Sequence, residues 1–239
     1  MIRFFAPDIV KDSALPEGES AHCCRVLRLK KGAEIEVVDG NGSVYSCVIV
    51  EPNPRHTCVE IVDVHVQPLH WKPYITLAIA PTKNIDRMEW LAEKAVEIGV
   101  NRLVFLNCHN NVRRVVKRER FDKILVSAMK QSLKASIPEF TEMIDFKDFI
   151  STDTSTKKFV GYCDSSVEKI DFAKAYDGES DITIMVGPEG DFTREEIEAA
   201  FNSGFKPVTF GNTRLRTETA GLDALCATHT LISLKANDS

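Results

Sequence analysis

The chain has 239 residues, of which 44% are hydrophobic, and it carries a net charge of −5 at pH 7. This length allows one large domain, or a small domain joined to a medium one, with a substantial hydrophobic core. The acidic balance argues against indiscriminate nucleic-acid binding, and no apolar run approaches the roughly 18 residues of a membrane-spanning helix.

The cysteines and the N-terminus favour a cytoplasmic protein. The seven cysteines are scattered, apart from the vicinal Cys23 and Cys24, and lack the spacing of a disulfide framework or a zinc site. We therefore expect reduced thiols and no metal ion. The first residues lack the long apolar core of a signal peptide, so we expect neither export nor a membrane location.

The first 70 residues are expected to form a small β-barrel. Residues 34–38 alternate between polar and apolar side chains and run into Asp39-Gly40-Asn41-Gly42, which is hairpin turn chemistry. Residues 44–50 would form the returning strand, and residues 58–66 alternate again. Several short strands with tight turns are typical of a small barrel.

Beyond a linker at 67–73 the pattern changes to alternating strands and helices, which predicts a second, α/β domain over 73–239 with a mainly parallel sheet. Thr193 and Glu196 have the spacing of a helix-capping box. The expected strands are 74–80, 103–106, 158–162 and 182–186, and the expected helices are 88–98, 121–133, one between 191 and 204, and 217–234.

Positive charge is concentrated in one stretch. Residues 102–134 hold nine basic and two acidic side chains, so this stretch carries +7 and the rest of the chain −12. A local basic surface on an acidic protein suits a selective polyanion site. The alternative is a solvated helix face without a ligand.

Two glycine-containing turns are the most informative motifs. Gly187-Pro188-Glu189-Gly190 follows the apolar run 182–186, and residues 211–220 follow the run 208–210 and open the last helix. Ligands bind at the carboxyl edge of strands in open α/β sheets, so the two turns can line one pocket. Taken singly, each could be an ordinary turn or a helix cap. No dinucleotide-binding or ATP-binding glycine motif is present.

In this order at the C-terminus, the two turns resemble the SPOUT methyltransferases, and most closely the family that methylates N3 of a uridine in 16S ribosomal RNA. The resemblance extends over nearly the whole chain. Its other motifs are Arg3-Phe4-Phe5, the block 22–32, Lys83, 86–90, 97–100, Arg113, 115–117, Gln131-Ser132 and Pro138.

The resemblance implies a knotted α/β methyltransferase domain preceded by a PUA-like β-barrel that binds RNA. It also implies S-adenosyl-L-methionine as cofactor, 16S ribosomal RNA or the small ribosomal subunit as partner, and a homodimer. The chain departs from the family pattern once in each of the two turns. Asp191 stands where a second glycine is usual, and Thr213-Arg214 replaces the usual Arg-Ile.

Site residues follow from the resemblance and from the chemistry of the two turns. Glycines permit close backbone approach to a bent ligand, and apolar residues supply walls for adenine, although core packing would explain the apolar residues equally. The expected cofactor residues are Val186, Gly187, Gly190, Phe210, Gly211, Leu215, Arg216, Thr219 and Ala220.

Methyl transfer to N3 needs in-line positioning and removal of the N3 proton. Glu218 and Glu189 are the candidate bases, and Arg216 is the candidate stabiliser of the uridine anion or a phosphate clamp. A helix-terminus or turn carboxylate remains the alternative for each glutamate.

RNA contacts are expected from basic residues, with Arg25 and Arg28 on one helical face. The expected set is Arg3, Arg25, Arg28, Lys30, Lys31, Arg113 and Lys117. Two other functions stay open: a SPOUT enzyme acting on transfer RNA or another ribosomal RNA base, and a non-catalytic RNA-binding module.

Overall fold

The computed structural model describes residues 2–237 and divides them into two compact units. The first unit comprises residues up to 70 together with 126–137, and the second comprises 71–125 and 138 onwards. Residues 126–137, which the sequence pattern places in the second domain, therefore belong to the first unit. Among the described residues, no helix is long and apolar enough to cross a membrane.

The first unit is built on a four-stranded sheet in the order β1-β2-β3-β4. The β2–β3 hairpin forms as predicted, because Asp39 Oδ1 accepts hydrogen bonds from the backbone N–H groups of Asn41 (2.8 Å) and Ser43 (3.1 Å). Only the β1–β2 pair is parallel. The strands are β1 (Arg3–Phe5), β2 (Glu34–Val38), β3 (Ser43–Glu51) and β4 (Cys58–Val66).

Three short helical elements accompany this sheet, and two of them, through Ile9 and Cys23, contribute to its core. They are α1 (Ile9–Asp12), α2 (Glu17–Ala21) and the π-helical turn η1 (His22–Val26). Segment 126–137 adds backbone contacts, with Gly42 donating to the Ala135 carbonyl and Ile137 donating to the Gly40 carbonyl. The side chain of Lys130 forms an ion pair with Glu19. A distant stretch of chain thus completes the first unit.

The second unit has a seven-stranded sheet in the order β7-β6-β5-β10-β8-β11-β9, in which every pair is parallel. This confirms the predicted parallel sheet. The strands are β5 (Ile75–Ile79), β6 (Arg102–Asn107), β7 (Glu139–Asp145), β8 (Lys157–Gly161), β9 (Ile170–Asp171), β10 (Ile182–Val186) and β11 (Lys206–Thr209). The sequence did not predict β7, because this edge strand carries few apolar residues.

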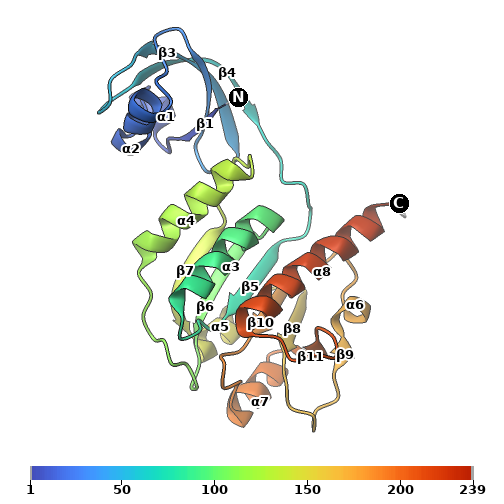
Figure 1. Cartoon of the computed structure of the whole chain (residues 1–239). Helices are drawn as coiled ribbons and strands as arrows, with labels where there is room; N and C mark the ends of the chain where they lie inside the picture. The colour runs from blue at the N-terminus through green and yellow to red at the C-terminus, as the bar shows by residue number, and fades with distance from the viewer. Residues whose placement is uncertain (1, 238–239) are drawn as a thin grey trace. The chain divides into compact units, whose positions relative to one another are not determined.

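The helices of this sheet match the predicted positions closely where they were predicted. Asn84 caps α3 by accepting from the N–H of Asp86, and the capping box of Thr193 and Glu196 is present in α7. The helices are α3 (Ile85–Ile98), α4 (Arg118–Gln131), α5 (Phe146–Thr152), α6 (Phe172–Ala175), α7 (Arg194–Asn202) and α8 (Thr217–Asn237). Helices α3 and α8 lie side by side (Figure 1).

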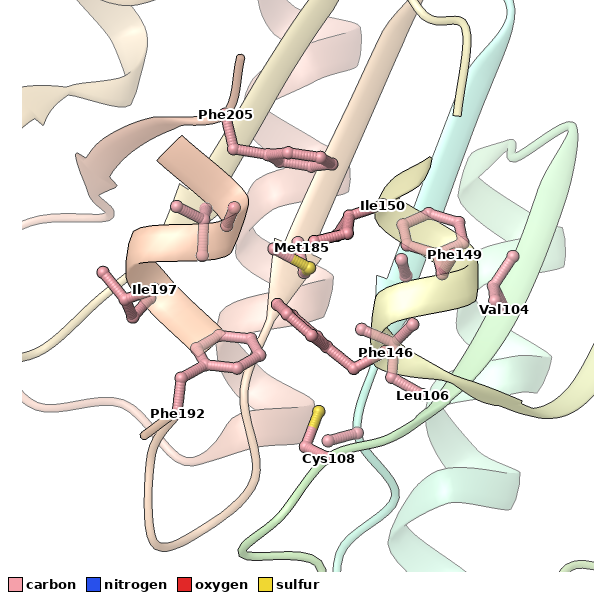
Figure 2. Packing of buried hydrophobic residues seen from close by; sticks show 14 residues of the cluster. Val104, Leu106, Cys108, Phe146, Phe149, Ile150, Met185, Phe192, Ile197 and Phe205 are labelled. Carbon is pink, nitrogen blue, oxygen red and sulfur yellow. The ribbon is translucent and has the colours of Figure 1, made fainter. Parts of the chain in front are cut away.

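Alternate residues of the strands point to opposite faces of the sheet, so each face has its own core. On one face, Phe146 of α5 and Ile197 of α7 belong to one hydrophobic cluster with Met185 of β10, as Figure 2 shows. On the other face α8 lies so close to β5 that a Cβ at Gly221 would be 2.9 Å from Cδ1 of Ile79. Because helices cover both faces of the sheet, a ligand can reach the strands only at their ends.

Candidate cofactor and active site

A cavity of about 390 Å³ lies at the carboxyl end of β10, between the two glycine turns. Its volume falls in the range of roughly 300–1,000 Å³ that is usual for small-molecule sites. Both turns line it, as the sequence predicted for two motifs at one sheet edge. The predicted site residues that line it are Val186, Gly187, Glu189, Leu215, Arg216, Glu218 and Ala220.

Four other predicted cofactor residues do not line this cavity. Gly190 is exposed and does not have a positive φ; its carbonyl accepts from Asn110 Nδ2 at 3.3 Å. The ring of Phe210 packs against Gly161 and lies 5.4 Å, centroid to centroid, from that of Phe172. Gly211 sits at φ +108°, and Thr219 is exposed. Phe210 and Gly211 therefore act on the conformation of the second glycine turn, through ring packing and through a positive φ respectively.

Gly187 directly follows β10 and is hydrogen-bonded to the first residue of α8. A Cβ at this position would lie 2.8 Å from the Phe192 ring, so only glycine fits without a shift of that ring. The hydroxyl of Thr217 donates a hydrogen bond to the Gly187 carbonyl (3.2 Å). This bond fixes the first turn of α8, and with it Glu218, beside the strand end.

Glu218 is a buried carboxylate at the cavity wall, only 6% exposed. Its Oε1 lies 3.6 Å from Nη1 of Arg87 on α3, while its Oε2 is buried and has no hydrogen-bond partner among the described residues. A buried acceptor without a partner is costly unless a ligand satisfies it. Glu189 differs, because it is exposed and its Oε2 already accepts from the backbone N–H of Lys83 (3.1 Å).

Two exposed arginines, Arg214 and Arg216, line the same cavity. Within the described part of the chain, neither guanidinium has a hydrogen bond or ion pair. They therefore place two uncommitted cations beside the buried carboxylate of Glu218.

The cavity also contains residues that sequence reasoning did not assign to it, namely Arg87, Cys163, Pro188, Asp191, Arg214 and Thr217. Arg87 lies within the family motif at 86–90, and Asp191 and Arg214 were visible as departures from the family pattern. Cys163 had no local signal at all. It follows β8, and only the order of strands in the sheet brings it next to β10.

The predicted RNA-binding residues of the first unit are exposed with one exception. Arg25, Arg28, Lys30 and Lys31 are all exposed. The expectation that Arg25 and Arg28 share a helical face is wrong, because η1 ends at Val26 and Arg28 has a left-handed backbone at φ +53°.

Arg3 is the exception. Its guanidinium forms an ion pair with Glu36 (2.9 Å) and donates to the side chain of Gln67 and to the carbonyl of Leu133, and its side chain is only 9% exposed. These bonds tie β1 to β2 and to segment 126–137, so we leave Arg3 out of the RNA surface.

In the second unit, the guanidinium of Arg113 donates to the carbonyl of Lys83 (2.8 Å) and is half-buried, whereas Lys117 is exposed. No cluster of three metal-ligating side chains occurs in residues 2–237.

Comparison with known proteins decides the family. An RNA methyltransferase domain model matches residues 70–229, and an RNA methyltransferase PUA domain model matches residues 15–62. This chain belongs to the RNA methyltransferase family. The resemblance and the fold class that the motifs indicated, a SPOUT-type α/β domain preceded by a PUA-like unit, are thereby confirmed.

Individual relatives agree over almost the full length. A probable rRNA-methyltransferase from Porphyromonas gingivalis is 40% identical, with a TM-score of 0.93 over 98% of this chain and 99% of that one. The ribosomal RNA small subunit methyltransferase E of Neisseria gonorrhoeae, solved bound to S-adenosyl methionine, is 29% identical, with a TM-score of 0.83 over 97% and 98%. The enzyme of that name from Aquifex aeolicus is 29% identical over 86% of this chain and 89% of its own.

The cavity of this family member suits S-adenosylmethionine. Val186, Leu215 and Ala220 give it apolar walls for an adenine, and charged side chains of both signs stand around the rest of it. Apolar walls with a few convergent polar groups are typical of cofactor sites. The unpartnered Oε2 of Glu218 further indicates that a ligand or substrate completes the site.

Proposed function

We propose that this chain transfers the methyl group of S-adenosyl-L-methionine to N3 of a uridine in the decoding region of 16S ribosomal RNA. One observation carries the proposal: the same cavity is lined by apolar residues, by Arg216 and by Glu218, whose Oε2 is buried without a partner. The names of the relatives supply the substrate class, the ribosomal RNA of the small subunit.

The protein needs to form no covalent bond to the substrate, because S-adenosylmethionine supplies an already activated methyl group. Val186, Leu215 and Ala220 line the cavity and would hold the adenosine, and the glycine turn at Gly187 lies in the same wall. Glu218 would accept the N3 proton, and the cofactor would supply the methyl group and leave as a neutral thioether. Arg216 stabilises the negative charge that develops on the uracil ring.

Glu218 is preferred over Glu189 as the base on geometric grounds. One oxygen of Glu218 is buried in the cavity wall and free to accept, and the ion pair with Arg87 holds the carboxylate in place. Glu189 is exposed and already accepts a backbone hydrogen bond from Lys83. We propose that Glu189 shapes the turn around the cofactor.

The function is tested with purified protein, labelled S-adenosylmethionine and small ribosomal subunits from a strain in which the gene is deleted. We expect label in 16S RNA and, because an N3 methyl blocks base pairing, a new reverse-transcription stop at one uridine. Label in transfer RNA or at another base would favour the other SPOUT activity. Binding of RNA without binding of S-adenosylmethionine would favour a non-catalytic module.

RNA binding is proposed to depend on two groups of basic residues. The first is Arg25, Arg28, Lys30 and Lys31 of the first unit, which are exposed, and the second is the half-buried Arg113 with the exposed Lys117. Each phosphate contact that is lost flattens the slope of log affinity against log salt by about 0.7–0.9. We therefore expect Arg25→Glu with Lys30→Glu to weaken RNA binding and to lower that slope by about one to two units.

Filter binding over a series of salt concentrations measures this slope. Charge reversal at the exposed Lys11 and Lys206, outside both groups, is the matched control for the change in net charge. If the control and test variants lose RNA affinity equally, RNA binding depends only on the total charge of the protein. If the test variant keeps the wild-type salt slope, the RNA-binding surface lies elsewhere.

We further propose that the protein acts as a homodimer in the cytoplasm, with residues 1–70 binding RNA and 73–239 carrying the catalytic site. Helix α8 supports the dimer, because Thr219, Asp223, Cys226 and Thr230 form an exposed stripe of small side chains at helical spacing. Sedimentation equilibrium tests this arrangement. A fully active monomer would contradict it.

A further inference from the structure

Asp191 and Arg214, two of the residues at which this chain departs from its family pattern, line one cavity. Asp191 follows Gly190 in the first turn, and Arg214 lies in the second turn, 23 positions later in the chain. Both line the cofactor cavity. Two independent departures that bring opposite charges to the same ligand site indicate a joint role there.

Asp191 is held in a fixed and unusual conformation. Its φ of +61° is left-handed, a conformation that aspartate tolerates better than most residues and that the usual glycine adopts freely. Its carboxylate accepts from its neighbour Phe192 N–H (2.9 Å, Oδ1) and from Cys163 N–H (3.2 Å, Oδ2). The carboxylate is therefore anchored across the end of β8, with lone pairs left for a cationic donor.

Arg214 provides the complementary charge. Its exposed guanidinium has no hydrogen bond or ion pair within the described residues, so it is free to bind an anion. Both charged residues line the cavity together with Cys163, and both act on its thiol electrostatically. Partial burial raises the pKa of this thiol, the Asp191 carboxylate raises it further, and Arg214 and Lys169 oppose the shift.

The other charged residues of the cavity are accounted for. Glu218 and Arg87 form an ion pair with each other, and Glu189 accepts from a backbone N–H. Arg216 stands beside Glu218 in sequence and is assigned to the uridine. Asp191 and Arg214 are left as one negative and one positive group without a ligand-independent partner of opposite charge.

We propose that Asp191 and Arg214 together bind the zwitterionic amino-acid end of S-adenosylmethionine. The Asp191 carboxylate accepts hydrogen bonds from the α-ammonium group, and the Arg214 guanidinium donates to the α-carboxylate. Charge-assisted hydrogen bonds of this kind are about twice as strong as neutral ones. The assignment rests on the proposed function, and it gives the two departures one shared purpose.

Calorimetry with three ligands tests the proposal. The ligands are S-adenosylmethionine, its decarboxylated form, which lacks the α-carboxylate, and 5′-methylthioadenosine, which lacks the whole amino-acid end. We expect Arg214→Ala to weaken S-adenosylmethionine about tenfold and to leave the decarboxylated form unchanged. We expect Asp191→Asn to weaken both of these about tenfold, and neither variant to change the affinity for methylthioadenosine.

Asparagine also tolerates a left-handed backbone, so Asp191→Asn retains that conformation, and its amide oxygen keeps one of the two backbone hydrogen bonds that the carboxylate accepts. Arg194→Ala, which removes an exposed arginine of α7 outside the cavity, is the matched control. An equal loss for methylthioadenosine would show that Asp191 only supports the loop, and a loss of RNA affinity alone in Arg214→Ala would assign Arg214 to a phosphate. Either result overturns the proposal. A wild-type protein that binds none of the three ligands would instead refute the proposed function.

Discussion

Replacing Glu218 with glutamine is expected to lower the rate of methyl transfer by a factor on the order of 10²–10⁴ at neutral pH, the range usual for loss of a general base. Glutamine keeps the size of the side chain and one oxygen, but it cannot accept the N3 proton. Single-turnover assays on small ribosomal subunits with saturating S-adenosylmethionine measure the chemical step directly.

The pH dependence separates a base from a structural carboxylate. If Glu218 removes the proton, the variant should recover part of its rate at high pH, because N3 then ionises without help. If Glu218 only balances the charge of Arg87, its loss should change folding or cofactor affinity and leave the shape of the pH profile as in the wild type. Calorimetry with S-adenosylmethionine and a thermal melt distinguish these cases.

Glu189→Gln is the matched variant, since Glu189 lines the same cavity but is exposed and bonded to the Lys83 backbone. We expect it to retain most of the rate. A full rate in Glu218→Gln, combined with a large loss in Glu189→Gln, would reassign the base to Glu189.

Arg216→Ala is expected to slow methyl transfer by about 10²–10³-fold, the effect of removing one donor that stabilises charge in a transition state. The affinity for S-adenosylmethionine should change much less. The negative charge that Arg216 stabilises develops only as N3 loses its proton, so the loss should fall on kcat rather than on ground-state binding.

Arg216→Lys keeps the charge but loses the planar fork of donors, so we expect only partial recovery. Arg194→Ala serves again as the control for removal of an exposed arginine. A loss in Arg216→Ala that appears wholly as weaker RNA binding, with normal single-turnover chemistry at saturating RNA, would make Arg216 a phosphate clamp.

Local patterns determined much of this fold. The alternation in residues 34–50 with the turn at Asp39 predicted the β2–β3 hairpin, and the spacing of Thr193 and Glu196 predicted the start of α7. Such features depend on contacts between residues close in sequence, so periodicity and turn chemistry encode them. The two glycine turns likewise marked the edge of the sheet where the cavity lies.

The tertiary structure decided which distant residues became partners. Arg3, read from the sequence as an RNA contact, is bound to Glu36 and to the carbonyl of Leu133, because segment 126–137 belongs to the first unit. No pattern in the sequence around Arg3 predicts these partners. A basic side chain looks the same in a sequence whether it ends in solvent or in a buried ion pair.

The same holds for the site. The sequence by itself predicted the family, the two turns that line the cavity, and Arg216 and Glu218 as candidate side chains. Only the sheet order, with β10 between β5 and β8, brought Arg87 to Glu218 and Cys163 to Asp191. The physical reason is that strand order in a parallel sheet is set by the packing of crossover helices on both faces, an interaction between segments far apart in the chain.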